Sequence, residues 1–220
     1  MTDSDRIEAL AAQYTAAMPD LDPSLQQAAL ALLRLLARGE PVEVQRLADA
    51  SGLPADYLEA TLAASPGIFR DDRGGVTGAL GLSVVEVGAH RLRIGGRSLS
   101  ARCALDTLYL PELLGSRARV ASRCPVTGAE ISLSVTPAGP VDLSPVDAVI
   151  SYLVPEEKFD LDVVQRFCDF VHFFASPQAA GQWTAEHPGT LVLGIDDAYR
   201  LAQLTDQAGF GAGLAAMGGW

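Results

Sequence analysis

Two short stretches of this sequence hold the residue types best suited to chemistry. The first contains Cys103 and Asp106, and the second contains Cys168 and His172. A thiolate is a nucleophile and a soft metal ligand, and a neighbouring carboxylate can accept or deliver a proton. The spacing within each pair therefore decides whether its two side chains can act together.

Both pairs have spacings that bring side chains together. If the chain is helical from Cys103 to Leu110, up to the proline that follows, Cys103 and Asp106 lie on one face, with about 5–6 Å between their Cβ atoms. Cys168 and His172 are four residues apart, which predicts a shared face in a helix and also in a strand. The sequence thus predicts two thiols, each with a titratable neighbour.

Less specific interpretations of these residues stay open. A single buried cysteine is most often a small core residue, which we consider above all for Cys124. A histidine in the aromatic run 171–174 is more often a hydrogen-bonded core residue than a catalyst. A structural zinc site of Cys103, Cys124, Cys168 and His172 lacks the short Cys-x2–4-Cys repeat of such sites. A cysteine-protease pair lacks the glycine-rich turn that we expect at its nucleophile.

Composition and charge restrict the class of protein. The chain has 220 residues, of which 49% are hydrophobic, enough for one large domain or two small ones. Its net charge is −11, with 16 basic and 27 acidic residues, and Lys158 is the only lysine. Nucleic-acid binding depends on a basic surface, so this balance disfavours it.

The same composition favours a protein of the cytoplasm. No run approaches the roughly 18 apolar residues of a membrane helix. The first residues are acidic and polar, the reverse of a signal peptide, so we expect a soluble, cytoplasmic protein. Three cysteines exclude a fully paired disulfide framework, and a reducing compartment leaves them as free thiols.

The first third of the chain predicts a helical domain. Its hydrophobic periodicity and helix caps indicate four helices and a hairpin, over residues 7–18, 22–39, 42–50, 55–64 and around 71–75. This order is typical of a winged helix with a helix-turn-helix pair. The stretch 55–64, where a recognition helix would lie, contains Asp56 and Glu59 and no Arg or Lys, which disfavours reading of DNA.

Beyond Leu80 the apolar residues alternate, which predicts antiparallel strands. We expect a strand pair at 82–84 and 92–94, a hairpin of 117–123 with 130–136, a strand at 149–154, helices at 176–186 and 196–207, and a mobile tail at 209–220. The fold class is therefore α+β. We expect an N-terminal winged-helix-like helical domain, residues 1–78, packed on a C-terminal mixed α+β domain, residues 79–220.

Three motifs in this order resemble the organomercurial lyase (alkylmercury lyase) family. They are Cys103-Ala-Leu-Asp-Thr-Leu, then Ala118-Arg-Val-Ala-Ser-Arg-Cys124 followed by Thr127-Gly-Ala, and Phe167-Cys168 leading into Val171-His-Phe-Phe-Ala-Ser176. The resemblance is strongest from about residue 97 to residue 190. Before that only the helical organisation agrees, because that family also carries a winged-helix-like N-terminal part.

The resemblance implies cleavage of a carbon–mercury bond, from R–Hg⁺ to R–H and Hg²⁺. It implies Cys103, Asp106 and Cys168 as catalytic residues that also hold the mercury, and Cys124 as a structural cysteine. Thiolates suit this soft metal, and a carboxylate can carry a proton from a thiol to the departing carbon. No cofactor is implied. Low-molecular-weight thiols and mercuric reductase are the expected acceptors of Hg²⁺.

The sequence departs from the family pattern at two positions, and other functions stay open. Arg102 replaces a frequent aromatic residue, which leaves the preferred organic group open, and Asp169 replaces a frequent second cysteine. One alternative is a non-catalytic carrier of Cu(I) or Hg(II) on the same scaffold. Another is a winged-helix regulator that senses metal through its cysteines. Asp106 favours the lyase, because a carrier needs no proton donor.

Overall fold

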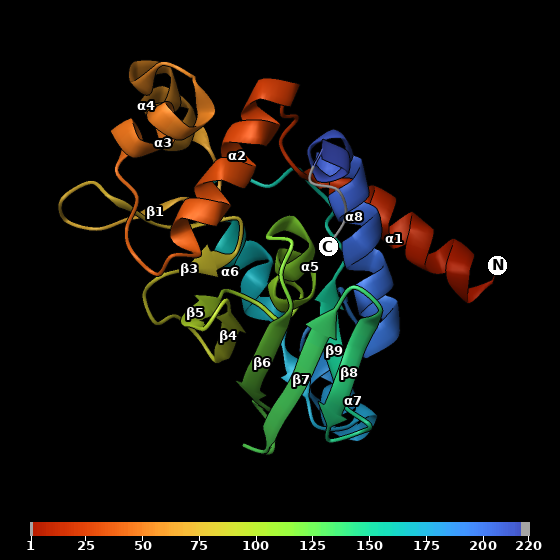
Figure 1. Cartoon of the computed structure of the whole chain (residues 1–220). Helices are drawn as coiled ribbons and strands as arrows, with labels where there is room; N and C mark the ends of the chain where they lie inside the picture. Colours follow the sequence, from red (N-terminus) through yellow and green to blue (C-terminus); the bar gives the residue numbers. More distant parts are fainter. Residues whose placement is uncertain (1, 217–220) are drawn as a thin grey trace.

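Four helices form the first part of the chain in the computed structural model, which describes residues 2–216 (Figure 1). They are α1 (Asp3–Ala17), α2 (Pro23–Leu36), α3 (Val44–Ser51) and α4 (Ala55–Ala64). Helix α2 begins as predicted, because the Asp22 side chain accepts hydrogen bonds from two backbone amides of its first turn. The helix-turn-helix arrangement expected from the sequence is thus confirmed.

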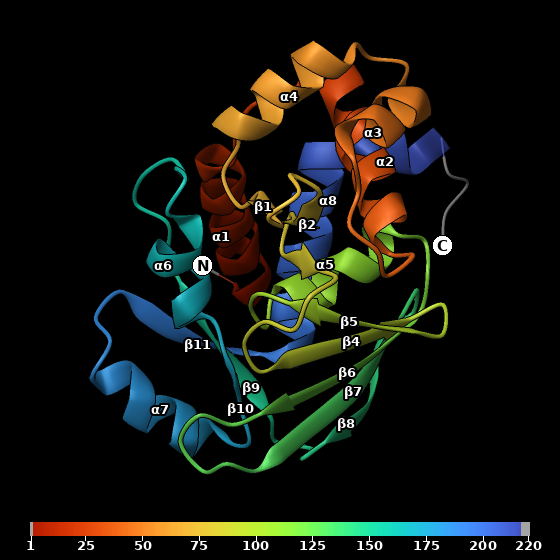
Figure 2. The same cartoon turned by 90° about the vertical axis from the view of Figure 1, so that its left-hand side faces the viewer.

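An antiparallel sheet of eight strands joins the predicted wing to the rest of the chain. Its order is β1-β2-β3-β5-β4-β6-β7-β8. The strands are β1 (Phe69–Arg70), β2 (Val76–Ala79), β3 (Leu82–Ser83), β4 (His90–Ile94), β5 (Arg97–Ala101), β6 (Ala118–Arg123), β7 (Glu130–Thr136) and β8 (Gly139–Ser144). Figure 2 shows β4 to β8 at one end of the molecule and α2 to α4 at the other. This arrangement confirms the α+β class.

One predicted strand pairing is wrong. We expected the strand at 82–84 to pair with that at 92–94, but β3 and β4 both pair with β5, which the alternation did not indicate. Gly95 and Gly96 have positive φ angles and form the two-residue turn between β4 and β5. We did not predict β5, because Leu99 is its single large apolar residue and one such residue gives no alternating pattern.

A second, smaller sheet carries part of the site. Its order is β10-β9-β11, from β10 (Phe173–Phe174), β9 (Val149–Leu153) and β11 (Thr190–Gly194). The central strand, β9, was predicted and is buried along most of its length. The short helices α6 (Val163–Arg166) and η1 (Cys168–Phe170), the latter a 3-10 helix, lie between β9 and β10 in the sequence.

In the second part of the chain, the structure confirms the predicted start of one helix and contradicts the predicted bounds of another. Helix α7 (Pro177–Ala185) begins at the predicted Ser176 cap. Helix α5 (Asp106–Leu113) neither starts at Cys103 nor ends at Pro111, which lies inside it. All residues of α5 are buried, and it packs against α8, so tertiary contacts outweigh the low helix propensity of proline.

The last helix is longer than the sequence predicted. Helix α8 (Ile195–Ala216) continues through the glycine-rich stretch that we expected to be a mobile tail, so that prediction is wrong up to residue 216. Phe210 and Leu214 are buried, and α8 packs against α1, α2 and α5. Buried side chains thus hold the helix despite its glycines. Residues 217–220 of the expected tail lie outside the described residues.

The proposed domain boundary at residues 78 and 79 falls inside β2, and the sheet continues across it. The division into 1–78 and 79–220 therefore stays a proposal. Within residues 2–216, no helix is long and apolar enough to cross a membrane.

Candidate active site

Cys103, Asp106 and Cys168 come together in the interior of the protein. One ligand atom from each of these side chains lies within 4.8 Å of the ligand atoms of the other two. All three residues are buried, and both cysteines are free thiols. We call this group the thiol–carboxyl cluster. The structure thus assembles the three residues that the family resemblance singled out, although Asp106 and Cys168 are 62 positions apart in the sequence.

The turn between β5 and α5 positions the first two members of the cluster. Cys103 lies in this turn, and Asp106 is the first residue of α5. The backbone N–H of Cys103 donates a hydrogen bond of 2.7 Å to Asp106 Oδ2. The predicted proximity is therefore present, although a turn and not a helix face produces it. This hydrogen bond holds the carboxyl group beside the thiol.

Backbone hydrogen bonds bring Cys168 to the same place. The N–H of Ala104 donates a hydrogen bond of 2.9 Å to the carbonyl of Val171, which joins the stretch that contains Cys103 to the stretch that contains Cys168. Ser151 of β9 fixes the segment further, because its Oγ donates to the Phe170 carbonyl and accepts from the His172 N–H. We did not predict a role for Ser151. The only feature of the sequence that marked it is that it is a polar residue within an apolar strand.

A tight turn between β2 and β3 covers Asp106. Gly81 has a φ of +76°, and a Cβ atom built on it would lie 2.2 Å from Asp106 Cγ. The turn is held on both sides, because the Tyr109 hydroxyl donates to the Leu80 carbonyl and the Arg102 N–H donates to the Gly81 carbonyl. Only glycine fits here, since the conformation is left-handed and the carboxyl fills the space.

Burial changes the acidity of the cluster. It raises the pKa of Asp106 from 3.8 to about 6, and the hydrogen bonds that the carboxylate accepts, first that from the Cys103 amide, oppose this shift. Burial also raises the pKa of the Cys103 thiol well above its ordinary value, as do its hydrogen bond to Cys168 and the nearby Asp106 carboxylate. At neutral pH the free protein thus holds a protonated Cys103 beside a carboxylate able to take its proton.

Aromatic side chains enclose the cluster. Tyr14 of α1 and Tyr152 of β9 pack edge-on against the Phe167 ring, beside Cys168. Burial raises the pKa of Tyr14, and the negative charges of the cluster raise it further, which places α1 close to the site. Helix α1 therefore contributes an aromatic side chain that packs beside the site.

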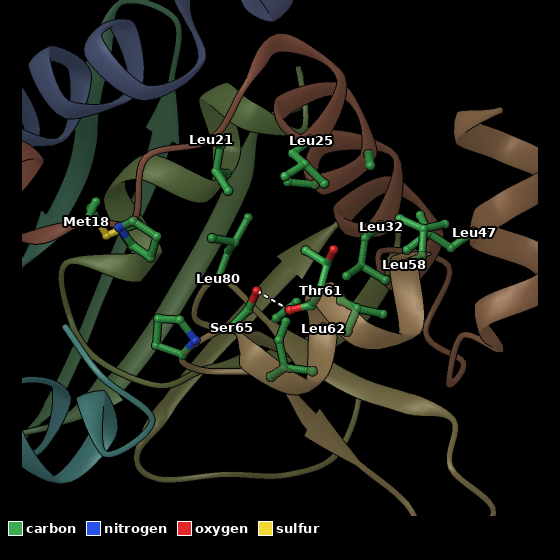
Figure 3. A pocket seen from close by; sticks show the side chains of 16 residues that line it. Met18, Leu21, Leu25, Leu32, Leu47, Leu58, Thr61, Leu62, Ser65 and Leu80 are labelled. Carbon is green, nitrogen blue, oxygen red and sulfur yellow. Dashed lines mark hydrogen bonds between the residues drawn. The ribbon is translucent and has the colours of Figure 1, made fainter. Parts of the chain in front are cut away.

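An apolar pocket that is lined mainly by residues of the N-terminal helices also borders Leu80 (Figure 3). Its wall comes from α2, α4 and the segment before α2, with Leu25, Leu58 and Leu62 among its residues. Leu80 belongs to the same turn that covers Asp106. The winged-helix-like part and the cluster thus meet at this turn.

Two residues considered from the sequence lie outside the cluster. Cys124 is buried at the end of β6, where burial raises its pKa but hydrogen bonds, first from Thr127, lower it overall. His172 packs against the Trp183 ring, and its Nε2 bonds to the Asp169 carbonyl. The predicted shared face with Cys168 is absent, because the chain changes there from a 3-10 helix to extended backbone. The four-residue zinc set is not assembled.

Two buried thiols and one carboxyl group of raised pKa are able to hold a soft metal ion and to carry a proton. Comparison with known families agrees. Residues 86–205 match the family described as alkylmercury lyase, and residues 9–80 match the helix-turn-helix domain of alkylmercury lyase. This chain belongs to the alkylmercury lyase family and is a carbon–mercury lyase.

Individual relatives support the same conclusion. The chain is 40% identical over 172 residues to the alkylmercury lyase of Staphylococcus epidermidis, covering 78% of each chain. It is 39% identical over 177 residues to that of Streptomyces lividans, covering 80% of each. The crystal structure of the mercury-bound form of MerB2 superposes with a TM-score of 0.71, covering 92% of this chain and 98% of that one. At 24% identity, this last likeness shows the fold alone.

Proposed function

We propose that this chain breaks the carbon–mercury bond by protonolysis, with Cys103 and Cys168 as mercury ligands and Asp106 as proton carrier. The observation that carries the proposal is the thiol–carboxyl cluster, whose ligand atoms lie within 4.8 Å of one another. One mercury ion can therefore contact both sulfurs while the carboxyl group stays within reach of the mercury-bound carbon. Mercury enters as part of the substrate, so the reaction needs no resident cofactor.

The first step is capture of R–Hg⁺ by one thiol. Asp106, as the carboxylate, takes the proton of Cys103, and the resulting thiolate binds mercury. Burial disfavours a free Cys103 thiolate, so loss of the proton is coupled to binding of the metal. The Cys103 thiolate therefore forms as the mercury cation binds in this buried site.

The second step is transfer of the proton to carbon. Cys168 loses its proton and becomes the second sulfur ligand, which raises the electron density on the mercury-bound carbon. Asp106 then delivers the proton from Cys103 to that carbon, and the electron pair of the carbon–mercury bond forms the new C–H bond. R–Hg⁺ and two thiols thus give R–H, Hg²⁺ bound by two thiolates, and one released proton. A carboxyl group with a pKa of about 6 suits both roles near neutral pH.

The product must leave by ligand exchange. Two thiolates hold Hg²⁺ too tightly for simple dissociation, so we infer transfer to low-molecular-weight thiols or to the cysteines of mercuric reductase. We assign the reaction to the cytoplasm, since all three cysteines are free and a reducing compartment keeps them so. The proposed role in the cell is mercury detoxification and resistance.

We infer that the winged-helix-like part shields the active site and does not bind nucleic acid. Tyr14 of α1 lies near the cluster, and Leu80 of the covering turn borders the pocket of α2 and α4. Helix α4 carries Asp56 and Glu59 and no basic residue, in a chain with a net charge of −11. Such a helix offers no cation to phosphates.

The variant Asp106→Asn tests the proton-carrier role. It keeps an oxygen to accept the Cys103 N–H and leaves both sulfur ligands in place, so the amount of Hg²⁺ retained at equilibrium should stay near the parental level, although the proton acceptor for capture of R–Hg⁺ is lost. Release of benzene from phenylmercuric acetate should fall by about 100-fold or more, because the general acid is gone. The measurements are mercury retention after gel filtration and benzene by gas chromatography. Parental turnover by Asp106→Asn would show that the proton comes from elsewhere.

A further inference from the structure

Another pocket is lined by residues of α1 and α8, which pack against each other. The connector between α1 and α2, and one residue of α5, complete its wall. Met18, Leu21 and Leu80 border both this pocket and the apolar pocket of Figure 3. We call it the α1–α8 pocket, and its wall includes Tyr14, Met18, Leu80, Tyr109, Asp206 and Ala208.

The turn that covers Asp106 is part of this wall. Leu80 directly precedes Gly81, where a Cβ atom would lie 2.2 Å from Asp106 Cγ. Tyr109 lies three residues after Asp106 in α5, and its hydroxyl donates a hydrogen bond of 2.7 Å to the Leu80 carbonyl. Leu80 and Tyr109 therefore border the pocket and the Asp106 carboxyl group at once.

The Cys168 side of the cluster shares a wall residue with the pocket as well. Tyr14 of α1 lines the α1–α8 pocket. Its ring packs edge-on against that of Phe167, the residue before Cys168, with 5.4 Å between the ring centroids. The pocket thus adjoins the thiol–carboxyl cluster on two sides, through side chains whose contacts are fixed in the structure.

The shared wall contains a strained residue. Leu80 has a φ of +48°, a left-handed conformation that a leucine rarely adopts. On the pocket side, the hydrogen bond from the Tyr109 hydroxyl holds its carbonyl in place. Strained residues persist only where their surroundings hold them, so the loss of this bond favours movement of the turn.

The chemistry of the pocket suits a cation that carries an organic group. Asp20 and Asp206 are among its described wall residues, and no Lys or Arg is. Asp206 is 3% exposed, and its Oδ2 atom has no hydrogen-bond partner within residues 2–216. Burial raises the pKa of Asp206 well above its ordinary value, and the Glu112 charge raises it further, so a bound cation would displace a proton. The apolar and aromatic wall residues fit the organic group.

A different pocket borders Phe167 but suits this substrate less well. It carries charges of both signs, with Lys158 and Arg166 among its residues, and it contains no residue of the turn that covers Asp106. The α1–α8 pocket combines contact with that turn and a wall without cations. The shared wall and the charge together therefore favour it as the route to the cluster.

We propose that the α1–α8 pocket is the entry site of the enzyme, where the organic group of R–Hg⁺ binds before the mercury reaches Cys103 and Cys168. Movement of the turn at Leu80 then opens the way to the cluster, and the Tyr109 hydroxyl holds this turn closed between turnovers. The inference rests on the proposed function, because it concerns the path of the same substrate.

The first test fills the pocket with Ala208→Trp, a change at an exposed wall residue of α8. The measured quantity is the rate at which N-ethylmaleimide, a neutral reagent, alkylates each cysteine, followed by mass spectrometry of peptides. Buried thiols react only when a path to them opens, so alkylation of Cys103 and Cys168 should slow by about tenfold or more. Alkylation of Cys124, which does not line this pocket, should keep the parental rate.

Turnover provides an independent measurement on the same variant. Ala208→Trp should lower kcat/KM for phenylmercuric acetate by about tenfold, because the filled pocket limits access of the substrate. The loss should be smaller for methylmercuric chloride, whose organic group needs less space. Both substrates are compared in the same excess of small thiol. A loss that is equal for the two mercurials would contradict binding of the organic group in this pocket.

Tyr109→Phe tests the turn itself, since it removes the hydroxyl that donates to the Leu80 carbonyl. Alkylation of Cys103 and Cys168 should become faster by about threefold or more, because the turn opens more often. Alkylation of Cys124 should again be unchanged. Parental alkylation rates in both Tyr109→Phe and Ala208→Trp would show that the route to the cluster lies elsewhere.

Ala9→Trp is the matched control for Ala208→Trp, because Ala9 is an exposed alanine of α1 that does not line the pocket. It should keep the parental alkylation rates and the parental kcat/KM. If Ala9→Trp and Ala208→Trp have equal effects, or if all three cysteines slow equally, the effect is one of general structure and the inference is wrong. If the parent releases no hydrocarbon from either mercurial, the proposed function fails, while the alkylation rates still decide whether this pocket leads to the cluster.

Discussion

The chemistry at the residue scale depends on where one proton resides. Residue types and spacing indicated two pairs, Cys103 with Asp106 and Cys168 with His172. The resemblance to the lyase family then singled out Cys103, Asp106 and Cys168, which the structure brings together. The sequence could not predict that burial raises the pKa of Asp106 to about 6, because the turn at Gly81 that covers the carboxyl group is distant in sequence. The sequence also did not show that His172 lies outside the cluster, where its ring packs against that of Trp183.

The raised pKa of Asp106 predicts a pH dependence of catalysis. Capture of R–Hg⁺ requires the ionised carboxylate in the free enzyme. The value of kcat/KM for phenylmercury should therefore fall as the pH is lowered through about 6, by about tenfold per unit below it. The measurement is benzene release on both sides of this pH, with the small thiol kept in excess. A profile that is flat through pH 6 would contradict Asp106 as the initial proton acceptor.

The turns, more than the helices and strands, position the cluster at the element scale. Caps and periodicity predicted α2, α4, α7 and the hairpin of β6 with β7, since these signals are local. They did not predict the turn at Cys103, the turn at Gly81 or the strand β5. These features depend on pairing between segments far apart, such as the hydrogen bond from Ala104 to Val171.

The turn at Gly81 yields a prediction at this scale. Gly81→Ala adds a Cβ atom 2.2 Å from Asp106 Cγ, so the carboxyl must move. Benzene release should fall by about 100-fold, because a displacement of this size disrupts the geometry for proton transfer. The left-handed backbone should also cost about 1–2 kcal/mol of stability, measured by thermal unfolding.

Gly96→Ala is the matched control for Gly81→Ala. Gly96 has a similar φ of +79°, yet a Cβ atom there meets nothing within 4 Å. Gly96→Ala should lose only the stability that the left-handed backbone costs, and Gly81→Ala should lose more, because its Cβ atom also collides with Asp106. Gly96→Ala should keep its activity. Equal activity of the two variants would mean that the turn does not determine the position of Asp106.

At the scale of the whole molecule, the two parts of the chain form one enclosed site. The order of the three motifs was sufficient to identify the family, and the period of the apolar residues was sufficient for the α+β class. The continuity of the sheet from the wing hairpin β1–β2 into β8 was not predictable, because the two-residue strands β1 and β3 leave almost no pattern. The role of active-site cover that we propose for the winged-helix-like part depends on this continuity.

The most direct test of the account is thiol-dependent benzene release from phenylmercuric acetate by the parent, Cys103→Ser and Cys168→Ser, with Cys124→Ser as the buried control. The account predicts benzene from the parent and from folded Cys124→Ser, and none from the other two variants. Tight mercury binding by the parent without any benzene would instead indicate a soft-metal carrier. Parental benzene release by Cys103→Ser would equally contradict a mechanism based on the thiol–carboxyl cluster.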